Sequence, residues 1–214
     1  MWCISEIDEE YKERMFDILD VYERDYDSKN PVICIDEKSK QLLSTPREGK
    51  PTRPGKAKKI DYEYKRHGTV NLFVSIEPKG KKRNITVTKR RTKVDFAKEI
   101  ESLLNRYNEA KKIILVLDNL NTHFPKSIEE NFRKEKAERI LEKIEWHYTP
   151  KHASWLNMAE IEINAISTQL LGKDIASFHE MQKHVFSWVN DRNKKQIGIK
   201  WQFTKEKAID KFKL

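Results

Sequence analysis

The sequence predicts an α/β protein in which a mixed β-sheet is flanked by helices. Short apolar runs rich in β-branched residues are typical of buried strands, and segments with apolar residues at helical spacing alternate with the later runs. The first three predicted strands follow one another without a helix between them. The chain has 214 residues, enough for one domain with a core, and its apolar runs exclude a disordered chain although 36% of its residues are charged.

The N-terminal part of the sequence predicts one helix followed by three strands. Ser5 and Asp8 form a capping-box-like start for that helix. Its apolar residues recur at helical spacing: Tyr11, Met15, Ile18, Leu19 and Tyr22. The run VICID predicts a buried strand that ends on Asp36, and residues 60–78 and 83–91 predict two strands joined by a basic turn. The proline-rich and glycine-rich residues 46–59 between them are expected to form a basic loop.

The remaining residues predict alternating helices and strands. The expected strands are 113–118 and 144–150. Helices are expected over 92–108, over 127–141, from within KHASWLNMAEIEIN to about residue 171, and over 178–190, and Thr204 is expected to cap a last short helix. Three meander strands followed by alternating elements match a ribonuclease H-like arrangement. A doubly wound fold is disfavoured because no helix separates the early strands and no Gly-rich phosphate loop follows an apolar strand.

Charge is distributed unevenly along the chain. Residues 1–27 carry ten acids and three bases, a net charge of −7, whereas residues 47–93 carry sixteen bases and four acids, a net charge of +12. The whole chain has a formal charge of +9. The basic zone predicts a polyanionic partner such as a nucleic acid backbone, and the alternative is a set of solvated loops.

Cysteine usage and hydropathy limit the class of protein. Cys3 and Cys34 lack the spacing of a zinc site, and the six histidines form no recognisable ligand set, so we expect neither a zinc site nor a disulfide framework. No apolar run is long enough for a membrane span, and acids begin at Glu6, which argues against a signal peptide. We therefore expect a soluble protein of the cytoplasm with no membrane partner.

Two aspartates each follow an apolar predicted strand. Alternation places Asp36 on the same strand face as Cys34 and sends Glu37 to the other face, and Asp118 shares a face with Val116. If the two strands are neighbours in the sheet, the two carboxylates meet and need a cation or a proton between them. Magnesium takes such hard oxygen ligands. The alternative is that each aspartate only ends its strand as a turn residue.

A third carboxylate is expected within KHASWLNMAEIEIN, residues 151–164. Glu160 and Glu162 flank opposite sides of the apolar stripe of the predicted helix, so only one of them can join the aspartates. Asn157 and Glu160 also fit an Asn-x-x-Glu capping box, whereas Glu162 fits a surface charge. Helical periodicity alone leaves the choice between the two glutamates open.

Six segments in this order resemble a known family. They are VICIDEKSKQLL, DYEYKRHGTVNLF, VTKRRTKVDFA, ILVLDNLNTH, HYTPKHASWLNMAEIEI and WQFT. Together they are similar to the catalytic domain of bacterial mariner-related transposases, the insertion sequence six-thirty family of the DDE superfamily. The resemblance extends from about residue 2 to residue 214, and it assigns an acidic helix to residues 1–30, the DDE catalytic domain to residues 31–192 and a C-terminal extension to residues 193–214.

The resemblance implies a metal-dependent DNA strand-transfer enzyme. By motif, the acidic triad is Asp36, Asp118 and Glu160, which would bind two Mg²⁺ ions, with Mn²⁺ as a substitute, to cut DNA at the element ends and join it to target DNA at a TA dinucleotide. It also implies a homodimer acting in the bacterial cytoplasm at the nucleoid. Relatives carry a helix-turn-helix domain that reads the element ends. Two alternatives remain open here: a separate or frameshifted chain supplies that domain, or the gene is a truncated remnant.

Further residues are expected beside the triad and along the DNA. The candidates for contacts to the phosphate backbone are Lys50, Arg53, Lys58, Lys59, Lys81, Lys82, Arg83, Lys89, Arg90, Arg91 and Lys93. The candidates for positioning phosphate or water are Asn119, Asn121, His123, Lys151 and His152, for which ordinary turn hydrogen bonds are the alternative. Two other functions remain open: a non-catalytic DNA-binding or regulatory transposase fragment, and a hydrolase of RNA–DNA hybrids.

Overall fold

The computed structural model of the chain describes residues 7–47, 54–55, 63–120 and 123–214. Five strands form one sheet in the order β3-β2-β1-β4-β5. The strands are β1 Val32–Ser44, β2 Lys65–Glu77, β3 Lys82–Thr88, β4 Ile113–Leu117 and β5 Ile144–Tyr148. The α-helices are α1 Glu9–Glu23, α2 Lys93–Arg106, α3 Pro125–Asn131, α4 Lys134–Glu142, α5 Ala159–Ile166, α6 Phe178–Lys194 and α7 Lys205–Phe212. A 3₁₀ turn, Ser154–Leu156, precedes α5, and a π-helical turn, Ser167–Leu171, follows it.

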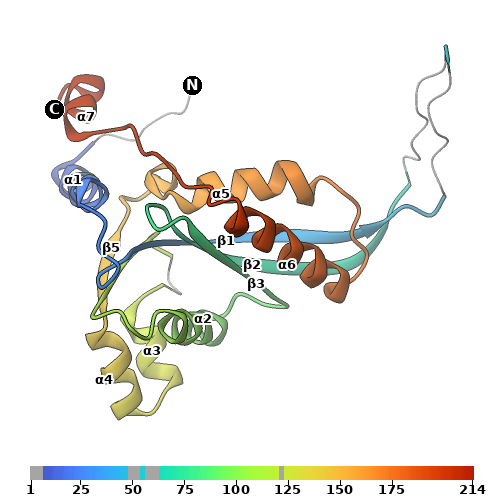
Figure 1. Cartoon of the computed structure of the whole chain (residues 1–214), viewed down its shortest axis with the longest axis horizontal. Coiled ribbons are helices and arrows are strands. Elements are labelled where there is room, and N and C mark those ends of the chain that lie inside the picture. Colours follow the sequence, from blue (N-terminus) through green and yellow to red (C-terminus); the bar gives the residue numbers. More distant parts are fainter. Residues whose placement is uncertain (1–6, 48–53, 56–62, 121–122) are drawn as a thin grey trace.

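The sheet is mixed, as predicted. Strands β1, β2 and β3 form an antiparallel meander, and β4 and β5 run parallel to β1 on its other side. Helices α2, α3 and α4 lie on one face of the sheet, and α5 and α6 lie on the other (Figure 1). This is the ribonuclease H-like arrangement expected from the order of the elements.

Strand alternation explains how both faces of the sheet become covered. On β1, Ile33 and Ile35 pack with Phe96 of α2, whereas Cys34 between them packs with Met15 of α1. All five residues of β4 are buried, which accounts for its unbroken apolar sequence. Helix α2 begins with a capping box in which Thr92 and Asp95 exchange hydrogen bonds. Local sequence signals therefore agree with the packing around the central strands.

Several predicted boundaries were wrong: β2 begins at Lys65 rather than at residue 60, and β3 ends at Thr88 rather than at residue 91. Two further differences are larger. Strand β1 does not end on Asp36 but continues to Ser44, because β2 stays paired with it along this whole length. Asp36 therefore lies within a strand, opposite Val74 of β2. The single helix expected over residues 127–141 is two helices, because Phe132 and Arg133 both have extended backbone angles.

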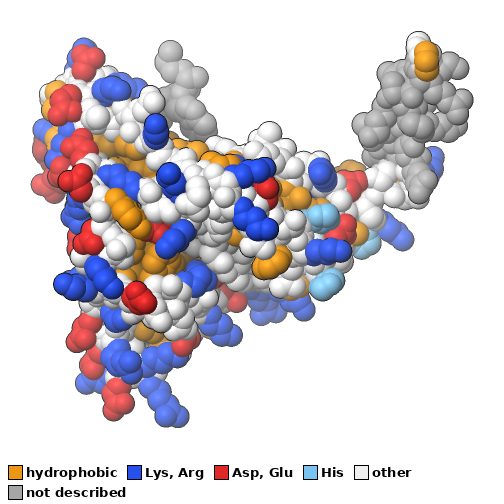
Figure 2. Space-filling view, in the orientation of Figure 1, with side chains coloured by type: hydrophobic (Ala, Val, Ile, Leu, Met, Phe, Trp, Pro, Cys, Tyr) orange, Lys and Arg blue, Asp and Glu red, His pale blue; other side chains and the backbone are white. Residues whose placement is uncertain are grey.

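The two ends of the described chain pack against each other. Helix α1 begins at the N-cap Asp8, whose carboxylate accepts a hydrogen bond from the backbone N–H of Tyr11 at 2.7 Å. Its apolar face and Ala208 of α7 belong to one buried cluster, while its acidic side chains face outward along the left edge of the molecule in Figure 2. Ser5 and Cys3 lie outside the described residues. No helix in the described part of the chain is long and apolar enough to cross a membrane.

Candidate active site

The sheet register brings the two predicted aspartates together. Parallel pairing between β1 and β4 ends with Cys34 opposite Val116. Two residues further along the chain come Asp36, within β1, and Asp118, directly after the last residue of β4, so alternation predicts the same sheet face for both side chains. Asp36 is 6% exposed. Asp118 is half-buried at the carboxyl end of β4, the position where open α/β sheets bind ligands.

Glu160 enters the same site from α5. It is the second residue of the helix and is half-buried, and its negative charge acts on the Asp36 carboxyl group. Asn157 does accept a hydrogen bond at the helix start, from the N–H of Ala159 at 3.0 Å. The other half of the capping box is not formed, since the Glu160 carboxylate makes no hydrogen bond to any residue that the structure describes. Glu160 therefore remains available as a ligand.

The Asp36 carboxyl group is buried with one oxygen unsatisfied. Its Oδ1 accepts a hydrogen bond from the Glu37 N–H at 2.6 Å, whereas Oδ2 is buried and has no partner among the described residues. Burial first, and then the negative charges of Asp118 and Glu160, raise the pKa of Asp36 to about 7. A carboxylate of this kind needs a proton or a cation to be stable.

His123 links the site to the opposite face of the sheet. Its Nδ1 lies 2.6 Å from Asp118 Oδ1, and its Nε2 lies 3.0 Å from Glu37 Oε1. Burial lowers the pKa of His123, but these two carboxylates outweigh burial and raise the pKa to about 9. The imidazolium donates to both acids and lies 4.7 Å from the Phe96 ring, so it fixes the orientation of Asp118.

The donor set fits a divalent metal ion of the magnesium type. Within the described ranges, no three His, Cys, Asp or Glu side chains are already arranged as a metal-binding group. The negative charges of Asp118 and Glu160 nevertheless act on the Asp36 carboxyl group, whose buried Oδ2 has no hydrogen-bond donor among the described residues. Carboxylate oxygens are the ligands that Mg²⁺ and Mn²⁺ prefer. Asp36, Asp118 and Glu160 are the residues that would hold the ion.

Glu162 is not a surface charge, as the sequence had suggested, but a fully buried one. Its carboxylate binds two guanidinium groups, with Oε1 2.9 Å from Arg83 Nε and 2.7 Å from Arg192 Nε. Oε2 lies 3.2 Å from Arg192 Nη2. The cluster joins α5 to β3 and α6, so Glu162 is committed to packing, whereas Glu160 has no such ion pair among the described residues.

The predicted DNA-contact residues fall into three groups. Lys50, Arg53, Lys58 and Lys59 lie outside the described residues, as does most of the predicted basic loop 46–59. The prediction for Arg83 was wrong, because its side chain is buried and bound to Glu162. The others lie at the surface, with Lys93 half-buried: Lys81, Lys82, Lys89, Arg90, Arg91 and Lys93. Of these, Arg91 reaches the site, with Nη1 3.8 Å from Glu37 Oε2.

The predicted auxiliary residues also lie in different surroundings. His123 contacts Asp118 directly, as described above. Asn119 is half-buried next to Asp118, Lys151 and His152 are exposed in the turn after β5, and Asn121 lies outside the described residues. Sequence reasoning did not single out Glu37, because strand alternation sends it to the face opposite Asp36. One signal could have identified Glu37: it follows directly on an apolar strand, and an acid that is buried there needs a cationic partner.

Comparisons with known proteins agree with this geometry. A model of the DDE superfamily endonuclease family matches residues 31–182, more than half of the chain. A search of curated proteins found no match. Among solved structures, the chain resembles the Mos1 transposase paired-end complex with left transposon end, with a TM-score of 0.58 and 15% identity over 100% of this chain and 63% of that chain.

Two more structures of the same transposase show the same likeness. For the Mos1 mariner paired end complex with Mn the TM-score is 0.57 at 15% identity, covering 94% of this chain and 67% of that chain. For the Mos1 Strand Transfer Complex it is 0.56 at 16% identity, covering 100% and 62%. This chain thus spans about two thirds of the length of those proteins, and at such identities the likeness establishes the fold. Because the family model covers the sheet and all three converging acids, the chain belongs to the DDE superfamily endonucleases.

Proposed function

We propose that the chain is the catalytic domain of a transposase that cleaves DNA at insertion-sequence ends and transfers the cut strand to target DNA. The observation that carries the proposal is that Asp118 and Glu160 act on the buried carboxyl group of Asp36, one oxygen of which has no partner among the described residues. Membership of the DDE endonucleases supports the nuclease chemistry. The resemblance to a strand transfer complex supports the joining step, and the six sequence motifs favour a bacterial element of the insertion sequence six-thirty type.

The three carboxylates would hold two Mg²⁺ ions, for which Mn²⁺ would substitute. Bound there, the metal would activate the attacking oxygen and stabilise the leaving oxygen of phosphoryl transfer. Structures of the Mos1 mariner paired end complex have been solved with Mg and with Mn, which supports this choice of ion. In this chain His123 holds the Oδ1 atom of Asp118 and would leave Oδ2 of that carboxylate to bind the ion.

DNA is the substrate that the basic surface favours. The residues proposed to contact its backbone are those at the surface: Lys81, Lys82, Lys89, Arg90, Arg91 and Lys93. Arg91 is connected to the site through Glu37, which it approaches to 3.8 Å and which lies 3.0 Å from His123 Nε2. Lys50, Arg53, Lys58 and Lys59 remain predictions from the sequence. We include in the proposal a homodimer acting on paired ends, a TA target, and a helix-turn-helix domain that reads the ends.

Nicking of element-end DNA tests the proposal. The purified chain should nick such DNA in Mg²⁺ or Mn²⁺, and Asp36→Ala should abolish nicking while leaving DNA binding, measured by gel shift, largely intact. The substitution should abolish metal binding without abolishing DNA binding, because the acid triad and the exposed cations are different residues. Equal nicking by the Asp36→Ala chain would contradict the assignment of the site.

A regulatory fragment without catalysis is the alternative function, and the same assay separates it. The chain spans 62–67% of the length of the Mos1 proteins it resembles, so the assay is run with and without a supplied DNA-reading domain. Nicking in either arm supports the transposase. DNA binding without nicking in both arms supports the fragment, and preferential cleavage of an RNA–DNA hybrid supports a hydrolase of hybrids.

The proposed backbone contacts predict a change in salt dependence. Arg90→Ala should weaken DNA binding uniformly across sequences and reduce the slope of log K against log salt concentration by about 1, because one fewer counterion is released. Arg133→Ala is the matched control, since Arg133 is also exposed but precedes α4. Binding titrations between about 50 and 200 mM salt measure both slopes. If the two variants change the slope equally, the contact surface has been misassigned.

A further inference from the structure

The segment that leads into α5 is attached to strand β1 by one buried amide. Asn157 is 0% exposed, and its Nδ2 donates to the carbonyl oxygen of Ile35 at 2.8 Å. Its Oδ1 accepts from the N–H of Ala159 at 3.0 Å. Ile35 precedes Asp36 in the chain, and Ala159 precedes Glu160. A single side chain therefore joins the backbone next to the first carboxylate to the backbone next to the third.

The Ile35 carbonyl is a group that the sheet leaves without a strand partner. At the start of β1, the Pro31 carbonyl accepts from Ile114 N–H of β4 at 3.0 Å. Backbone carbonyl groups two and four residues after Pro31 point to the same side of β1 as the Pro31 carbonyl. The carbonyl group of Ile35 therefore also faces β4. The pairing of β1 with β4 ends at Cys34 and Val116, however. The Asn157 amide takes the place of the next strand amide, at the level where the sheet opens and the acids meet.

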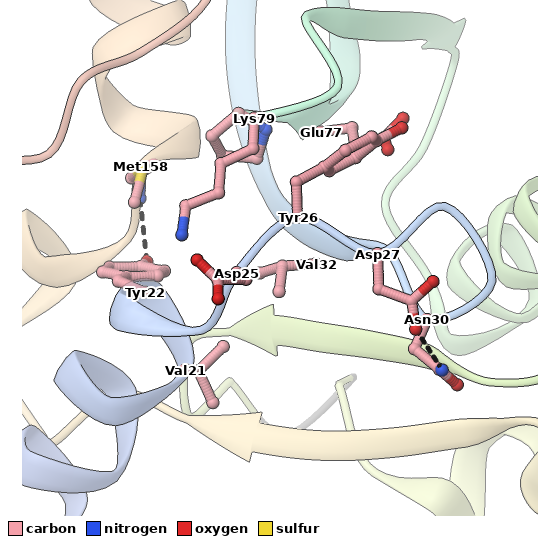
Figure 3. A pocket seen from close by; sticks show the side chains of 11 residues that line it. Val21, Tyr22, Asp25, Tyr26, Asp27, Asn30, Val32, Glu77, Lys79 and Met158 are labelled. Atoms are coloured by element: carbon pink, nitrogen blue, oxygen red, sulfur yellow. Dashed lines mark hydrogen bonds between the residues drawn. The ribbon is translucent and has the colours of Figure 1, made fainter.

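Tyr22 of α1 supports the same segment from behind. Its hydroxyl donates to the Leu156 carbonyl at 2.7 Å and accepts from the Met158 N–H, whose nitrogen lies 3.3 Å away. Figure 3 shows the second of these contacts, with the Tyr22 ring beneath Met158. Tyr22 thus binds the residues on both sides of Asn157. The segment cannot shift along β1 without breaking buried hydrogen bonds at both ends.

We propose that Asn157, held in place by Tyr22, is a positioning residue that sets the separation of Asp36 and Glu160 for metal binding. The inference rests on the proposed metal site and goes beyond it, because Asn157 reaches no ligand itself and acts only through the backbone. A cap that merely started the helix would need the bond to Ala159 alone. The second bond, to a carbonyl 122 residues away in sequence, is the one that couples α5 to the strand carrying Asp36.

Metal binding by the full 214-residue chain without DNA tests this inference. Mn²⁺ is titrated and the bound ion is followed by electron paramagnetic resonance, with Asp36→Asn used to subtract ions held elsewhere, such as on the acidic α1. Asn157→Ala should weaken the Asp36-dependent binding roughly 10–100-fold, the range found when a residue that orients a ligand is lost. Tyr22→Phe should weaken it less, because the amide contact to Ile35 remains.

Matched controls separate positioning from general loss of stability. Asn71→Ala removes another buried amide, which accepts a hydrogen bond from Ser39 on β1 at 2.7 Å, and Tyr107→Phe removes another partly buried hydroxyl, which donates to Glu77 at 3.1 Å. Both should lower the thermal midpoint but leave Mn²⁺ affinity unchanged. Unchanged affinity in Asn157→Ala, or an equal loss in Asn71→Ala, would overturn the positioning role alone. If the unsubstituted chain shows no Asp36-dependent Mn²⁺ binding, the metal site itself is refuted and the inference falls with it.

Discussion

A Glu160→Ala chain is expected to stay folded and to lose metal-dependent nicking, whereas a Glu162→Ala chain is expected to lose its stability. Glu160 is half-buried at the site and has no hydrogen-bond partner among the described residues, so its removal breaks no hydrogen bond or ion pair within the described chain. It would remove a metal ligand, and the loss of activity should exceed the roughly 100-fold that loss of a ligand's supporting partner costs. These two glutamates are two residues apart in sequence and opposite in role.

The expected loss of stability in Glu162→Ala follows from two guanidinium groups left behind. Arg83 and Arg192 both bind this carboxylate, and the Arg83 side chain is fully buried. Burial already lowers the pKa of Arg83, which shows how poorly its charge is solvated. Removing one partner of a buried ion pair typically lowers the free energy of unfolding by about 3–5 kcal/mol. A loss of this size is a large share of the stability of an ordinary domain, about 5–15 kcal/mol.

Urea unfolding and nicking have to be measured on both variants, because an unfolded chain also fails to cut. The expected pattern is a normal unfolding midpoint without nicking for Glu160→Ala, and a strongly lowered midpoint for Glu162→Ala. A Glu162→Ala, Arg83→Met double variant should recover part of the stability, since it removes one of the unpaired charges. If Glu160→Ala cuts normally and the folded Glu162→Ala chain does not, the third ligand is Glu162.

The second large effect is that Asp36→Asn should make the metal-free protein more stable at pH 8. The folded structure raises the pKa of Asp36 from the ordinary 3.8 to about 7, through burial and then through Asp118 and Glu160. The proton is therefore bound more tightly in the folded state, so stability is greatest below the unfolded pKa and falls as pH rises from about 4 to about 7. Above pH 7 the buried carboxylate is ionised, and the neutral amide should gain roughly 2–4 kcal/mol.

Unfolding free energies at pH 5 and pH 8, in the presence of a chelator, measure this effect. The gain from Asp36→Asn should be small at pH 5 and large at pH 8. Mn²⁺ should reverse the order, because only the unsubstituted chain gains stability by binding the ion. An Asp36→Asn chain that is less stable at pH 8 without metal would show that the carboxylate is satisfied in a way this site does not provide.

Some features of this protein follow from sequence patterns that are local or periodic. The apolar runs of β1 and β4 specify buried strands, and Thr92 with Asp95 specifies the start of α2. Alternation along each strand grouped Asp36 with Cys34 and Asp118 with Val116, and the order of elements predicted the mixed sheet. These features could be predicted because the physical cause lies within a few residues: side-chain period, strand propensity and capping.

Other features depend on partners that are far away in the sequence. Asp36 lies within β1 rather than at its end because β2 remains paired beyond it. Helical periodicity placed Glu160 and Glu162 symmetrically about one stripe, and only the packing of β3 and α6 on α5 brings two arginines to Glu162. Asn157 fits a helix cap in the sequence, yet half of its hydrogen bonding goes to β1. The sequence by itself determined which residue types were able to form the site. The tertiary structure decided which carboxylate is neutralised by buried cations and which is left for a metal. The reason is that a buried charge is stable only when an opposite charge lies close to it in space, whatever their separation in sequence.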